Sequence, residues 1–199
     1  MIIDHLKNDG FLNNMSFPRN LYQFKRNMEL DEYFNTLDII ENTDVGWTVD
    51  KNAKVGDISF FMQTTSAIEN INNIENEILK IKDTKEKEYL QKCLNKGKEL
   101  YNLYGGKIFA IGVVVEEPFT EKNEDRDYIH WTSRTYAHIE IIEVLDNPVD
   151  KEEFKEITHI EPKGAITKLS NDKCKKILEI ISKHNDIEKI IPFLKSFNK

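Results

Sequence analysis

The chain has 199 residues, of which 39% are hydrophobic and 32% charged. This size predicts one globular domain with a single sizeable core, and the lack of a long apolar stretch argues against a membrane span. The net charge of −7, from 35 acidic and 28 basic residues, argues against a protein that coats a nucleic-acid duplex, because that mechanism needs clustered Lys and Arg.

The N-terminal segment is polar. Residues 1–19 contain Gly10, Asn13, Asn14 and Pro18, a composition that predicts a loosely docked extension. The first residues lack the cationic head and apolar core of a signal peptide, so we expect a cytoplasmic protein.

Short elements follow this extension. Leu21-Tyr22-Gln23-Phe24 predicts a first short strand. The apolar spacing within 31–40 predicts a short helix lying across a sheet, and two further strands are predicted at 47–49 and 58–62.

The stretch 67–104 predicts a helical hairpin. Its first half has isoleucines at steps of three and four residues behind Ser66, and its second half begins at Asp83; each of these residues has Glu three positions later, the spacing of a capping box. Gly105-Gly106 then leads directly into the apolar run 107–115, which is typical of a central strand. The hairpin is therefore predicted to be inserted between two strands of one sheet.

The remaining strands complete the predicted fold. The run 135–145 reverses its inward and outward alternation near Ile141, which predicts a β-bulge that bends the sheet. The region 157–160 is a candidate last strand. Because strands and helices do not alternate regularly, we expect an α+β fold with a small mixed, curled sheet or pseudo-barrel, peripheral helices and the inserted hairpin.

Helical patterns dominate the C-terminal region. Ser170 is predicted to cap a helix that carries Cys174, and residues 186–199 form an amphipathic tail. Cys93 and Cys174 are far apart in sequence and both fall on helical patterns, which favours buried free thiols over a disulfide.

The order of several short motifs resembles the EVE domain family of the PUA-like superfamily, which is related to the YTH domains. The motifs are Leu21 to Asn27, Trp47, Gly56-Asp57 with its aromatic strand, Gly105 to Val114, and Ile160 to Ser170. The resemblance covers about 20–182 and implies a domain at 20–185, with 67–104 as an insertion outside the compact family pattern.

The resemblance implies a binding module for one modified nucleobase in DNA or RNA, in a bacterial or phage defence or restriction context. Two tryptophans, Trp47 and Trp131, would form the walls of an aromatic cage, because stacking on an aromatic ring holds a flat base. The other expected ligand-binding residues are Lys25, Arg26, Asn27, Thr48, Gln63 and Thr64. A tryptophan beside a strand is also a common core residue, and Lys25-Arg26 is equally compatible with an ordinary surface pair.

Signals for catalysis are weak, so we expect no catalytic residues, cofactor or metal. The histidines lack metal-ligand spacing, and no phosphate-binding loop, nucleophile elbow or dinucleotide glycine pattern is present. Two alternatives stay open. One is a protein-interaction module that docks a partner through 67–104, and the other is an enzyme acting on a nucleotide or small molecule through the loop 125–130.

Overall fold

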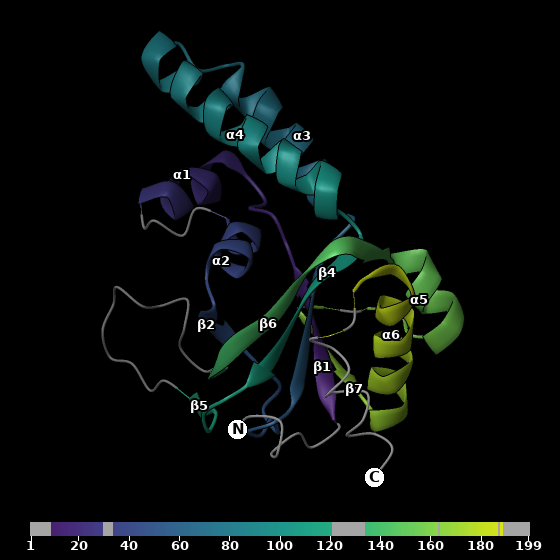
Figure 1. The fold of residues 1–199 in the computed structure, drawn as a ribbon. Helices are drawn as coiled ribbons and strands as arrows, with labels where there is room; N and C mark the ends of the chain where they lie inside the picture. The colour runs from purple at the N-terminus through teal and green to yellow at the C-terminus, as the bar shows by residue number, and fades with distance from the viewer. Residues whose placement is uncertain (1–8, 30–33, 121–133, 163, 187, 189–199) are drawn as a thin grey trace.

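The computed structural model describes residues 9–29, 34–120, 134–162, 164–186 and 188. The strands are β1 (Gly10–Met15), β2 (Asp44–Thr48), β3 (Ile58–Gln63), β4 (Lys107–Val114), β5 (Phe119–Thr120), β6 (Thr135–Asp150) and β7 (Ile166–Leu169). In the described part of the chain they form one mixed sheet in the order β2, β6, β4, β3, β1, β7, with β5 paired to β6 off this path (Figure 1). The predicted α+β class is confirmed.

The centre of the sheet is formed by the most apolar runs. Nearly every residue of β3 and β4 is buried, as expected for strands covered on both faces. The pairing of β4 with β6 shifts register between Ile111 and Gly112, whose partners are Glu143 and Ile141. The predicted bulge near Ile141 is therefore confirmed, and the long β6 arches across the top of a curled sheet (Figure 1).

The prediction of a loosely docked extension is wrong for residues 10–15. This segment is β1, which lies inside the sheet, parallel to β3 on one side and antiparallel to β7 on the other. Phe11 and Leu12 are buried in cores on opposite faces. The polar composition misled the prediction, because the buried Asn13 finds a hydrogen-bond partner in Ser59 of β3.

The predicted strand at 21–24 is also wrong, because these residues open the helix α1 (Leu21–Glu29). The Asn20 side chain accepts a 3.0 Å hydrogen bond from the Gln23 backbone N–H, and the Gln23 side chain accepts one of 3.0 Å from the Arg19 N–H. Together these bonds satisfy backbone donors at the start of the helix. The next helix, α2 (Asn35–Glu41), falls within the stretch predicted to be helical.

The predicted hairpin is confirmed as α3 (Ala67–Ile78) and α4 (Thr84–Tyr104), inserted between β3 and β4. It projects beyond the sheet, and α1 and α2 lie between the two (Figure 1). A third hydrophobic core joins the hairpin to these helices through Phe17, Phe24 and Phe34. Gly97 makes this packing possible, because a Cβ there would lie 2.7 Å from Phe17 Cε2.

The C-terminal region differs from the prediction in one element. Residues 157–160, the predicted last strand, contain the end of α5 (Lys151–Thr158) and a turn at His159, which has a positive φ of 56°. The last strand is β7, and α6 (Asn171–His184) follows it. Cys93 and Cys174 are buried free thiols, as predicted.

Helices α5 and α6 cover one face of the sheet, and α2 and Trp47 pack toward the other. None of the described helices combines the length and apolar character that a membrane span requires. Residues 187 and 189–199, most of the predicted tail, lie outside the described residues.

Candidate functional site

Two neighbouring cavities open where β1 leaves the sheet and the chain turns into α1. The first, called here the α1–α2 cavity, has a volume of about 400 Å³. It is lined by Ser16, Phe17, Pro18, Arg19, Asn20, Tyr22, Gln23, Arg26, Asn27, Phe34, Asn35, Thr36, Gln63, Gly97 and Leu100. The second, called here the Trp47 cavity, has a volume of about 480 Å³. It is lined by Asn13, Asn14, Met15, Ser16, Asn35, Trp47, Thr48, Val49, Lys51, Arg134, Thr135, Ala165 and Ile166.

The two cavities share Ser16 and Asn35 in their walls, so they are adjacent parts of one cleft. Each volume falls in the lower half of the range of about 300–1,000 Å³ that small-molecule sites occupy. A ligand group in one cavity would therefore lie beside a group in the other.

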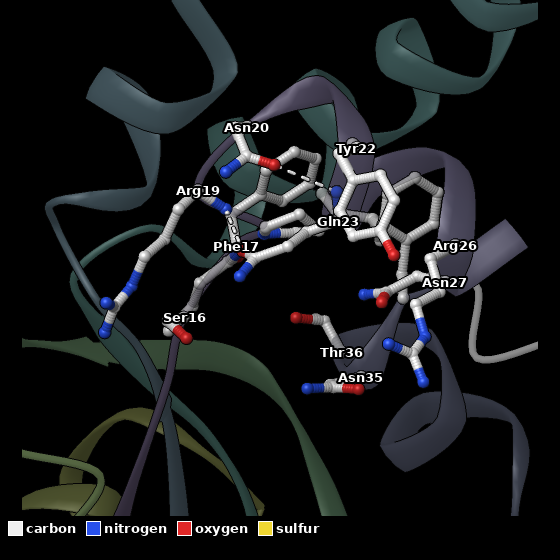
Figure 2. Close-up of a pocket in the computed structure, with 15 residues that line it drawn as sticks. Ser16, Phe17, Arg19, Asn20, Tyr22, Gln23, Arg26, Asn27, Asn35 and Thr36 are labelled. Atoms are coloured by element: carbon white, nitrogen blue, oxygen red, sulfur yellow. Dashed lines mark hydrogen bonds between the residues drawn. The ribbon is translucent and has the colours of Figure 1, made fainter. Parts of the chain in front are cut away.

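The α1–α2 cavity is enclosed by segments that are distant in sequence. The loop before α1 and α1 itself form the upper wall in Figure 2, and α2 forms the lower wall. Arg19 and Arg26 lie on opposite sides of the opening in that view. The inserted hairpin contributes Gly97 and Leu100 of α4 to the cavity wall.

Gln63, at the end of β3, is an unusual lining residue. Its side chain is 4% exposed, and its Oε1 has no hydrogen-bond partner among the described residues. A buried amide oxygen without a partner is unfavourable by about 1–3 kcal/mol. A ligand with a hydrogen-bond donor would relieve this penalty.

The Trp47 cavity has a comparable arrangement. Trp47 lies on the edge strand β2, half buried, and its ring meets Phe61 edge-on at a centroid distance of 5.9 Å. Asn14 donates from Nδ2 to the Gly164 carbonyl at 3.2 Å. Its Oδ1 is buried and has no partner in the part of the chain that the structure describes. This cavity too combines an aromatic ring with an unsatisfied amide acceptor.

The charge of the cleft is opposite to that of the protein. Four cationic residues line the two cavities, namely Arg19, Arg26, Lys51 and Arg134. No Asp or Glu among the described residues lines either cavity, although the chain has 35 acidic residues. None of the four cations forms an ion pair with a described residue. Among the described residues, no ion pair and no acidic side chain in the lining offsets the positive charge of the cleft.

Amides account for much of the remaining polar lining. Seven Asn and Gln side chains line the two cavities together: Asn13, Asn14, Asn20, Gln23, Asn27, Asn35 and Gln63. An amide offers both donors and an acceptor, which suits the polar edge of a nucleobase. The cleft thus combines aromatic rings, side-chain amides and cationic groups.

The structure divides the predicted site residues among different places. Arg26, Asn27 and Gln63 line the α1–α2 cavity, whereas Trp47 and Thr48 line the Trp47 cavity. Asn27 and Trp47, both expected to bind the same base, therefore line adjacent cavities and not one cage.

Two predicted residues line neither cavity, and one is not described. Lys25 forms an ion pair with Glu86 of α4. Thr64 forms a turn in which its hydroxyl lies 2.9 Å from the Ser66 hydroxyl. Trp131, the predicted second wall, and the loop 125–130 lie outside the described residues.

Several cleft residues were not predicted to belong to the site. Asn14 was assigned to the extension, and Asn35, Lys51 and Arg134 carried no local motif. Asn14 had one usable signal, because Asn13-Asn14 is flanked by apolar residues on both sides, as in a short buried strand. The other three reach the cleft through tertiary packing alone.

No family model matches the sequence, and no curated protein matches it. Among solved structures, the crystal structure of a mutant of the ZmASCH protein from Zymomonas mobilis overlays on 88% of this chain and 98% of its own, with 6% sequence identity and a TM-score of 0.41. A likeness this distant assigns neither a family nor a function.

Proposed function

We propose that this protein is a binding module for single-stranded or locally opened DNA or RNA, with one modified base held in the Trp47 cavity. The observation that carries the proposal is the lining of the cleft. It holds four cations without an ion-pair partner among the described residues, and no described acidic residue, in a protein of net charge −7. Phosphate groups complement this charge, and bases complement the aromatic and amide groups beside it.

The Trp47 cavity supplies the features that a single base needs. The indole would stack on the base, and the Asn14 Oδ1 would accept a hydrogen bond from an exocyclic amine. Lys51 and Arg134 would contact the flanking phosphates. The ordered resemblance to EVE domains in the PUA-like superfamily supports a base that carries a methyl or similar small group.

Such a site should bind single strands more tightly than an intact duplex. Removing a base from a duplex costs a few kcal/mol, and this cost is lowest where the strand is already unpaired. Because the protein as a whole has a net charge of −7, a long duplex that extends beyond the cleft would be repelled.

The test compares labelled oligonucleotides by fluorescence anisotropy. Single strands of DNA and RNA, with and without one methylated base, are titrated against the wild-type protein, and a blunt duplex of the same sequence is the reference. We expect tighter binding to a single strand. Trp47→Leu should weaken that binding roughly 5- to 150-fold, because stacking contributes about 1–3 kcal/mol per base.

The matched control is Tyr89→Leu, which removes an exposed aromatic ring of α4 outside both cavities. It should leave the affinity unchanged. Equal binding of duplex and single strand, or equal losses in the Trp47 and Tyr89 variants, would contradict the proposal.

A further inference from the structure

We infer that the α1–α2 cavity is a second nucleotide subsite, so that the smallest ligand filling the cleft is a dinucleotide. This inference rests on the proposed function, since it assigns the nucleotide next to the one in the Trp47 cavity. The two cavities share Ser16 and Asn35, which brings adjacent nucleotides of one strand within reach of both.

The two cavities carry the same three kinds of group. Each has one accessible aromatic ring, Tyr22 in the first and Trp47 in the second. Tyr22 is 71% exposed, so its ring is open to stacking. Each cavity also has two cations without an ion-pair partner among the described residues, and one buried amide oxygen without a described hydrogen-bond partner. A site that repeats these three groups suits a ligand that repeats base and phosphate.

Two nearly buried polar side chains line the α1–α2 cavity and could bind a ligand there. Gln63 and Thr36 are each 4% exposed. The Thr36 hydroxyl faces the open space beneath α1 in Figure 2. Gln63 Oε1 would accept from a base amine, and its Nε2 would donate to a neighbouring ring nitrogen or carbonyl, the bidentate pattern that suits adenine.

The arginines are placed for the backbone of the same nucleotide. Arg19 and Arg26 lie on opposite sides of the cavity, which matches the phosphates on the two sides of one sugar. A guanidinium can donate two parallel hydrogen bonds to one phosphate.

Titration calorimetry with a mononucleotide and a dinucleotide of the same single-stranded sequence tests the inference. The wild type should bind the dinucleotide at least tenfold more tightly. Gln63→Leu should reduce this gain to less than threefold while leaving mononucleotide affinity unchanged. It should also keep or raise the thermal midpoint, because the removed amide oxygen has no described partner and Leu is of similar size.

Two further variants keep the result interpretable. Thr36→Val, which is nearly isosteric, replaces Gln63→Leu in the test if that variant misfolds. It should lower the affinity for the dinucleotide and leave the affinity for the mononucleotide unchanged. Gln91→Leu, on α4 outside both cavities, should change neither affinity. Equal affinity of the wild type for the two ligands, with mononucleotide binding still dependent on Trp47, would overturn the inference and leave the proposed function standing. If the wild type bound neither the mononucleotide, nor the dinucleotide, nor any longer single strand, both the inference and the proposed function would be overturned.

Discussion

The side-chain amide of Asn13 donates a 2.9 Å hydrogen bond to the Ser59 hydroxyl, across the parallel pair of β1 and β3. Both side chains are at most 1% exposed. The bond therefore replaces water for a polar residue in the middle of the sheet. It explains how β1 accommodates the buried Asn13 between its two neighbouring strands.

Ser59→Ala should lower the free energy of unfolding by about 1–3 kcal/mol, because it leaves the buried Asn13 amide without its partner. Urea denaturation followed by circular dichroism measures the change. The double variant with Asn13→Leu should be less destabilised than the sum of the two single variants. Additive losses would show that the hydrogen bond contributes nothing.

Patterns extending over many residues predicted their elements correctly, whereas some short, ambiguous segments were predicted wrongly. The isoleucine spacing of α3 and the apolar run of β4 gave correct elements because each repeats one period over several residues. The segments at 10–15 and 21–24 are short. The segment 10–15 depends on the hydrogen bond between Asn13 and Ser59, and the segment 21–24 depends on the packing of Phe24 in the hairpin core. Both sets of contacts involve residues that are distant in sequence.

The candidate site was predictable only in part, for the same reason. Aromatic and basic residues pointed to Trp47 and Arg26, which do line the cleft. The sequence could not place them in separate cavities, because α1 was taken for a strand. Asn35 and Lys51 reach the cleft through the packing of α2 and the loop after β2, which no local pattern encodes.

The two predicted capping boxes of the hairpin differ in the structure, and this difference can be measured. The Asp83 carboxylate accepts a 2.9 Å hydrogen bond from the Glu86 N–H, whereas Ser66 makes no side-chain cap bond. Asp83→Ala should therefore lower the free energy of unfolding by about 0.5–2 kcal/mol. Ser66→Ala, the matched control, should lower the free energy of unfolding by less. Thermal and urea denaturation of the two variants measure this difference. Equal losses would contradict the assignment of the cap to Asp83.

Cys174 should make stability depend on pH in the alkaline range. Burial, together with the smaller effect of the negative charges of Asp9 and Asp57, raises the pKa of its thiol from 9.0 to about 12. Because the folded pKa is the higher one, the neutral thiol's contribution is complete below about pH 9 and is lost as the pH rises toward 12.

The difference in unfolding free energy between the wild type and Cys174→Ala should accordingly shrink from pH 9 to pH 12. Comparing the two proteins cancels the contribution that Lys and Tyr titration makes to the unfolding free energy, because both proteins contain these residues. The native thiol should also resist alkylation at pH 8, because burial excludes the reagent and the thiolate is scarce. A constant difference across this range would contradict the raised pKa.

Lys25 and Arg26 are consecutive on α1, yet they should contribute very differently to nucleic-acid binding. The Lys25 ammonium is paired with Glu86, whereas Arg26 lines the cleft without a described ion-pair partner. Arg26→Gln should weaken single-strand binding roughly five- to tenfold and lower the slope of log affinity against log salt by about 0.7, the value expected for one lost phosphate contact. Lys25→Gln lowers the net charge by the same amount but should leave both quantities nearly unchanged, because the Lys25 ammonium contacts Glu86 and lines neither cavity. Anisotropy titrations across a salt series measure both quantities, and equal slopes for the two variants would mean that Arg26 does not contact phosphate.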